Sequence, residues 1–209
     1  DTGSILDELG ILQMLRDESV EFIDLNHGPF TLKRLDHNSP SETRLNTLID
    51  EMTFHISYTQ LKQHEEAVMS ASIKNVALSW PPAEEHGHPK KNLGIHKHLH
   101  GFIRAMAKII PIDLAIVSTM PAMVGTGPAK GVARNAGMVI AGTDPVTVDT
   151  LCARLLGFRP QAIQYLYALI ACGIGEGDLE RIQLSGLALK DAEKAFSHAV
   201  YGQSFALDE

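Results

Sequence analysis

The chain has 209 residues, 44% of them hydrophobic and 21% charged, which is the composition of an ordinary soluble globular protein. Its two cysteines are too few for a disulfide framework or a cysteine-ligated cluster, and no apolar run is long enough to span a bilayer. We therefore expect one domain covering residues 1–209, in a reducing, cytoplasmic setting and without a membrane partner.

Short apolar runs rich in β-branched residues alternate along the chain with longer stretches of helical period. The predicted strands are residues 21–25, 53–58, 75–80, 114–119, 137–141 and 181–185. The predicted helices are residues 5–16, 42–52, 95–109, 146–156, 161–171 and 190–198. This alternation predicts a layered α/β fold with a largely parallel, possibly mixed, β-sheet flanked by helices. In such sheets, ligands bind beyond the carboxyl ends of the strands.

Two helix boundaries and two long irregular segments stand out. Asp144 directly precedes Pro145, which predicts an N-capped helix that begins there. Gly173 predicts the end of the helix before it. Residues 81–94 and 120–136 look too long and too irregular to be simple connectors, and long ordered loops in compact domains are often functional.

Five of the ten histidines lie within residues 86–100. In the predicted helix, His96 and His100 are spaced i, i+4 and share one face. His88 could add a third nitrogen, which would give an open three-histidine site for a divalent metal such as Zn or Fe. Metal-bound imidazoles usually need a carboxylate behind them, and here it would have to approach in the fold. The candidate carboxylates are Glu65, Glu66, Asp144 and Asp149. A mobile, solvated histidine loop is the alternative.

Charge is distributed unevenly along the chain. Residues 86–143 contain seven lysines and arginines and a single acid, so this window carries +6 although the net charge of the chain is −7. A basic centre in an acidic protein favours a small anionic ligand over nucleic acid, whose backbone the acidic remainder would repel. A solvated basic face is the alternative.

Three basic side chains lie near the carboxyl end of a predicted strand. Lys62 and His64 alternate after residues 53–58, so they project from one side if the chain is extended. Lys74 and Asn75 open the next predicted strand. Lys62, His64 and Lys74 would together hold a phosphate or a carboxylate. Surface charges flanking a turn are the alternative.

The glycine-rich stretch from Gly125 to Gly131 offers backbone N–H groups that can cradle an oxyanion, with Lys130 beside them. Thr126 and Gly127 lie within it. It is not a Walker A loop, because no glycine-lysine-serine or glycine-lysine-threonine is present, and its third glycine is one place late for a dinucleotide-binding fingerprint.

Two aspartates share the predicted helix that follows. Asp144 is most simply its N-cap, whereas Asp149 has no capping role there. If Asp149 faces the loop, it is a candidate general base, metal ligand or partner that orients a histidine. An aspartate on the surface is the alternative.

Several ordered motifs resemble the domain-of-unknown-function 362 (DUF362) family. They are Lys62-Gln63-His64 with Lys74-Asn75, Gly125-Thr126-Gly127-Pro128, residues 141–149 (AGTDPVTVD), residues 156–158 (LGF) and residues 173–179 (GIGEGDL). The resemblance spans about residues 24–187 and implies an α/β domain of uncertain activity. The residues that it marks are Lys62, His64, Lys74, Asn75, Gly125, Gly127, Asp144 and Asp149.

The resemblance also implies an association with iron–sulfur proteins, because many members carry ferredoxin-type cysteine motifs. This chain lacks those cysteines, so we expect no iron–sulfur cluster on it. Members usually begin with a further βα region containing a lysine-proline-asparagine motif, which this chain also lacks.

The leading hypothesis is an α/β domain that binds a small anionic ligand at the carboxyl edge of its sheet. If it catalyses a reaction, His64 would act as acid or base and Asp149 would orient it. One rival is a non-catalytic scaffold for an iron–sulfur or redox protein partner, with the histidine segment as its docking surface. A second rival is metal storage or delivery through a histidine loop.

Overall fold

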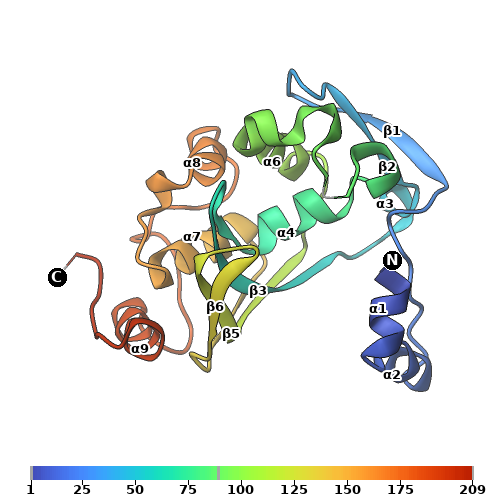
Figure 1. Cartoon of the computed structure of the whole chain (residues 1–209). Helices are drawn as coiled ribbons and strands as arrows, with labels where there is room; N and C mark the ends of the chain where they lie inside the picture. The colour runs from blue at the N-terminus through green and yellow to red at the C-terminus, as the bar shows by residue number, and fades with distance from the viewer. Residues whose placement is uncertain (1, 89, 209) are drawn as a thin grey trace.

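A mixed β-sheet carries the fold in the computed structural model, which describes residues 2–88 and 90–208 (Figure 1). Its five strands in this part of the chain are β3 (Ile56–His64), β4 (Val68–Ser70), β5 (Leu114–Thr126), β6 (Lys130–Arg134) and β7 (Val139–Gly142). The order is β4-β3-β5-β6, and β7 also pairs with β5. Parallel pairing is confined to β3 and β5, where Ile56 faces Leu114, and the other pairs are antiparallel. The α/β expectation is confirmed in its mixed form.

Helices pack on one face of this sheet. Those in direct contact with the strands are α4 (Ser72–Ser79) and α7 (Pro145–Leu155), and α6 (Leu99–Ala107), α8 (Gln164–Ala171) and α9 (Leu189–Tyr201) pack against these two helices. The core lies between them and the sheet and includes Leu61, Phe102 and Leu166, none of which is exposed. The opposite face of β3 is open, since Tyr58 is 72% exposed. The short helical elements are α5 (Ala83–His86), η1 (Asn92–His98) and η2 (Pro160–Ala162).

The first two helices lie apart from this core, whereas Leu35 and Leu45 further along the chain belong to it. Helices α1 (Thr2–Glu8) and α2 (Ile11–Asp17) bury no residue and form the predicted helix over residues 5–16 as two pieces (Figure 1). The predicted strand at residues 21–25 is wrong, because that stretch is irregular. The predicted helix at 42–52 is also wrong over its first half. There, β2 (Glu42–Asn46) pairs antiparallel with β1 (Phe30–Arg34), and α3 (Leu48–Glu51) follows.

Residues 75–80 are helical, so the predicted strand there is wrong. The buried side chains Ile73, Val76, Ala77 and Trp80 follow the i, i+3, i+4, i+7 spacing of a helix face, and the apolar run alone hid this period.

Residues 120–136 are not an irregular loop either, because β5 continues through Thr126 and turns back into β6 as a hairpin. The predicted strand at 181–185 is absent as well: that segment stays irregular, across a groove of about 690 Å³ from β7.

The marked helix boundaries are confirmed. The Asp144 carboxylate accepts hydrogen bonds from the backbone N–H groups of Val146 and Thr147, with Pro145 in the first turn of α7. Helix α8 ends at Ala171, and Gly173 follows with a φ of 71°, which suits glycine. The predicted irregular segment 81–94 contains α5 and the start of η1, and its Pro89 lies outside the described residues. No helix among the described residues is long and apolar enough to cross a membrane.

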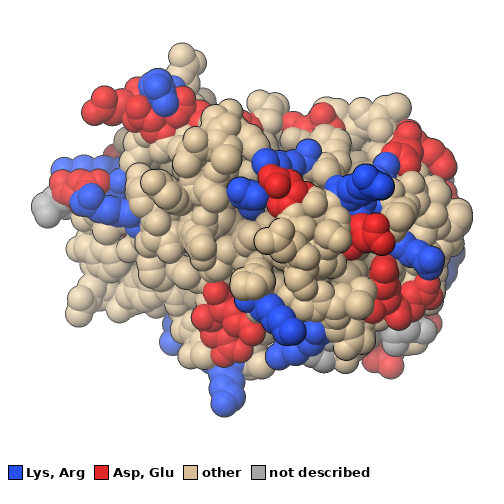
Figure 2. Space-filling view, turned by 90° about the horizontal axis from the view of Figure 1, so that it is seen from above, with Lys and Arg blue, Asp and Glu red and all other residues tan. Residues whose placement is uncertain are grey.

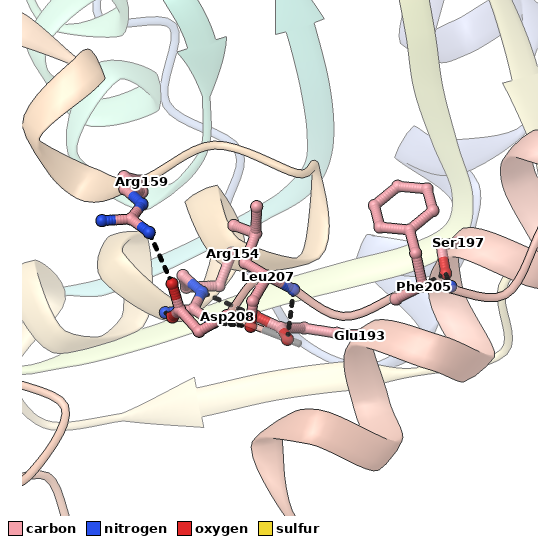
Figure 3. A network of polar contacts seen from close by, with 7 residues as sticks. All are labelled: Arg154, Arg159, Glu193, Ser197, Phe205, Leu207 and Asp208. Atoms are coloured by element: carbon pink, nitrogen blue, oxygen red, sulfur yellow. Dashed lines mark hydrogen bonds and ion pairs between the residues drawn. The ribbon is translucent and has the colours of Figure 1, made fainter.

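A buried ion pair joins α7 to α9 and to the C-terminal residues (Figure 3). The Arg154 guanidinium donates to the Glu193 carboxylate at 2.6 Å, and both side chains are almost completely buried. Arg154 also donates to the Leu207 carbonyl, while the Leu207 N–H donates to Glu193. Asp208 accepts from Arg154 and Arg159 at the surface. This network fixes the last described residues against the helical layer.

We expect Glu193→Ala to lower the free energy of unfolding by about 3 kcal/mol, because it leaves the buried Arg154 without its buried counter-ion. Asp50→Asn is the matched control, since its pair with Lys33 lies at the surface, away from Arg154, and should contribute less than about 1 kcal/mol. Urea denaturation of the whole chain measures both. Equal, small losses would show that the buried pair does not stabilise the fold.

Candidate functional site

The carboxyl end of β3, the β3–β4 turn and the first turn of α4 bring the predicted basic residues together. Lys62 and His64 lie on β3, and Lys74 lies in α4, two residues after its start. The charges are close enough to interact, since Lys74 lowers the pKa of His64 and Lys62 lowers the pKa of Lys74. We call Lys62, His64 and Lys74 the cationic site.

Lys74 is the most unusual member of the cationic site. It is only 7% exposed, and no carboxylate or carbonyl in the described part of the chain pairs with its ammonium group. Burial lowers its pKa from 10.5 to about 8, the nearby Glu66 charge opposes that shift and Lys62 adds to it. By contrast the partly buried Lys90 donates to the carbonyls of Leu78 and Ser79.

His64 acts as a neutral hydrogen-bond donor. Its Nδ1 accepts the backbone N–H groups of Glu66 and Ala67, so the ring proton of the neutral form is on Nε2. Burial, and then the charge of Lys74, lowers its pKa to about 4. At neutral pH this imidazole therefore offers an N–H rather than a positive charge.

The histidine cluster is divided among different structural roles. His96 Nδ1 contacts the Glu66 carboxylate. His100 Nδ1 accepts the Tyr165 backbone N–H, and its ring stacks on that of Tyr165. His88 is exposed. No group of three or more metal-binding side chains is placed to hold an ion among residues 2–88 and 90–208. The arrangement therefore gives the His88, His96 and His100 prediction no support.

Asp149 does not face a loop. It is fully buried and accepts hydrogen bonds from the backbone N–H and Oγ of Ser72, the backbone N–H of Ile73 and the Tyr165 hydroxyl. It thus caps α4 from the neighbouring helix α7 and ties α8 to both. In this position Asp149 supports Lys74 through the backbone of α4 and has no contact with His64.

The glycine-rich stretch forms the β5–β6 turn, in which Gly125 pairs with Gly131 and Thr126 with Lys130. The Gly125 N–H donates to the Gln63 side chain, and the Gly127 carbonyl accepts the Glu65 N–H. A Cβ at Gly127 would lie 2.3 Å from the Gln63 carbonyl oxygen, so only glycine fits this approach. The stretch therefore packs against the end of β3, and the Gly125 N–H already donates to Gln63 rather than to a ligand.

The remaining predicted residues lie around this centre without joining it. Asn75 follows Lys74 in α4 and is partly exposed. Lys130 is exposed at the start of β6. Asp144 is used by the cap of α7 and by the Glu176 N–H.

A polar cleft of about 440 Å³ adjoins the cationic site. Its lining includes Glu66, His96 and His100, of which Glu66 and His100 interact with the charge of Lys74. It also includes His37 and Gln164 from outside the histidine segment. Sequence reasoning listed Glu66 only among four candidate carboxylates and missed Tyr165 and Gln164, because no motif marks them.

The charged side chains form no continuous positive surface on the face seen in Figure 2. Basic and acidic residues are interspersed there, and a broad area carries neither.

An α/β fold with polar residues gathered beyond the end of a central strand defines the general class of this protein. The model of the family described as Domain of unknown function (DUF362) matches residues 1–154, and the chain belongs to this family. This confirms the resemblance, although residues 155–187 lie outside the match. No curated protein and no solved structure matches the chain.

Asp149 provides a pH-dependent test of the α4 cap. Burial raises its pKa from 3.8 to about 6, so the folded chain takes up this proton at a higher pH than the unfolded chain. The resulting stabilisation is present below the unfolded value and is lost as the pH rises through about 6. The quantity to compare is the unfolding free energy of the wild type minus that of Asp149→Asn. We expect this difference to be about 1 kcal/mol larger at about pH 5 than at about pH 7.5.

Urea denaturation of both proteins at the two pH values measures this difference. The exposed substitution Asp7→Asn is the control and should track the wild type at both. A difference between wild type and Asp149→Asn that does not change with pH would contradict the raised pKa.

Proposed function

We propose that this protein binds a small anionic ligand, a phosphate or a carboxylate, at the cationic site. The observation that carries the proposal is Lys74, whose side chain is largely buried and whose ammonium makes no hydrogen bond or ion pair with another described residue. Burying an ammonium costs free energy unless an anion or hydrogen-bond acceptor compensates it. A bound oxyanion supplies that compensation.

The surroundings of Lys74 support an anion rather than a cation. Lys62 adds a second positive charge, and neutral His64 can donate its Nε2 hydrogen. Glu66, the nearby carboxylate, is already in contact with His96. A metal ion at this position would face two ammonium groups, and His64 could offer it no free nitrogen lone pair in its present tautomer.

The position in the fold supports the proposal as well. His64 is the last residue of β3, which runs parallel to β5, and ligands in α/β sheets bind beyond the carboxyl ends of such strands. The capped α4 holds Lys74 there, so the chain presents its charge before any ligand arrives. A preorganised cation of this kind lowers the cost of binding.

Sulfate provides a test because its charge is constant between pH 7 and 9. We expect its affinity to fall by about tenfold over this range as Lys74, whose pKa is about 8, loses its proton. Lys74→Met should weaken binding at pH 7 and remove most of this pH dependence. Isothermal titration calorimetry on the whole chain measures both effects.

Lys33→Met is the matched control. Lys33 lies on β1 and pairs with Asp50 of α3, so this substitution should leave sulfate binding unchanged. If sulfate, inorganic phosphate and acetate neither bind nor raise the melting temperature, anion binding is refuted. If the protein also purifies free of metal, that result would favour the alternative that it is a non-catalytic scaffold for an iron–sulfur or redox partner. Several loosely bound metal ions would instead favour the histidine delivery loop.

A further inference from the structure

The wall of the 440 Å³ cleft is polar and almost uncharged. Its hydrogen-bonding side chains come from three separate places: His37 and Asn38 before β2, His98 at the end of η1 and Gln164 at the start of α8. Its two charged groups have opposite sign, Glu66 and Lys97. The volume lies within the range of small-molecule sites.

Several of these polar groups are free to bind a ligand. Among the described residues, no protein atom hydrogen-bonds the side chains of Asn38 and Gln164, and His98 makes only an edge-on ring contact with His37. His37 Nδ1 lies 3.0 Å from the Pro40 carbonyl and donates to it, so Nε2 of its neutral form remains an acceptor. The cleft therefore presents both donors and acceptors, without a dominant charge.

The position of His37 depends on a glycine. A Cβ at Gly101 would lie 3.1 Å from two atoms of the His37 ring. The missing side chain allows this imidazole to lie directly on α6, where it forms one wall of the cleft.

The groove beside β7 has a different character. Its wall includes the apolar side chains Val148, Leu151 and Leu155 of α7 together with the exposed Leu184 and Leu187. The polar cleft includes a single apolar side chain among those that line it, the buried Leu99. The neutral hydrogen-bond donors and acceptors that line the polar cleft suit a ligand with several hydroxyl groups, because each hydroxyl both donates and accepts a hydrogen bond.

We propose that the ligand of this protein is a polyhydroxylated small molecule with one anionic group, such as a sugar phosphate or a sugar acid. This inference rests on the proposed function. The anionic group binds Lys62 and Lys74, and the hydroxylated body lies in the polar cleft against Asn38, His98 and Gln164. Glu66 and His100 lie where the two parts of the ligand meet, because they line the cleft and interact with the charge of Lys74.

Calorimetric titration of the whole chain at pH 7 tests this with four probes: glucose 6-phosphate, gluconate, inorganic phosphate and butyl phosphate. We expect glucose 6-phosphate or gluconate to bind about tenfold more tightly than inorganic phosphate and butyl phosphate, because each satisfied hydroxyl adds hydrogen bonds. Which of the two is tighter identifies the anionic group.

Exposed side chains of the cleft provide variants that leave the core intact. Gln164→Leu and Asn38→Leu should each reduce the affinity for the hydroxylated ligand by about fivefold and leave inorganic phosphate binding unchanged. Gln161→Leu is the matched control, because Gln161 is an exposed glutamine of η2 outside the cleft. Lys74→Met should lower the affinity for every probe.

The outcomes separate this inference from the proposed function. If inorganic phosphate binds but neither hydroxylated probe binds more tightly, the ligand class is wrong and anion binding stands. Tighter binding of butyl phosphate than of both hydroxylated probes would also overturn the class. If none of the four probes binds, both proposals fail.

Discussion

One buried carboxylate holds the site together. Asp149 on α7 accepts two backbone N–H groups and a hydroxyl at the start of α4, and the Tyr165 hydroxyl on α8. Tyr165 in turn donates its backbone N–H to His100 of α6. Three helices, α4, α7 and α8, are therefore linked through a single side chain. The first turn of α4 carries Lys74, so the direction of its ammonium depends on this cap.

Histidines are abundant around the site, yet their roles are mostly architectural. His100 accepts the Tyr165 backbone N–H, and buried His86 contacts the Thr43 hydroxyl at 2.9 Å. His64 is held as a neutral donor by two backbone N–H groups. At neutral pH the positive charge comes from two lysines, Lys62 and Lys74, instead. This division separates the groups that set the shape of the site from those that set its electrostatic potential.

Short sequence motifs predicted those elements that depend on contacts between residues close together in the sequence. The Asp144-Pro145 pair located the start of α7, and alternation placed Lys62 and His64 near Lys74 without knowledge of the fold. Long-range contacts decided the rest. Asp149 looked free because its partners lie 77 and 76 residues away in sequence, at Ser72 and Ile73. Likewise, residues 120–136 looked like a loop because their glycines suggested flexibility. In the fold, Gly127 instead allows a close approach to β3, and residue spacing alone does not show that two strands pair there.

The ion pair at Arg154 has a consequence for where the folding unit ends. The family match stops at residue 154, but the counter-ion of that arginine, Glu193, lies on α9, and its carbonyl acceptor belongs to Leu207. A fragment trimmed to the family boundary would end on a guanidinium without these partners and would uncover the side of α7 on which α9 packs. The buried charge at the end of the family segment is therefore neutralised by residues that lie beyond that segment.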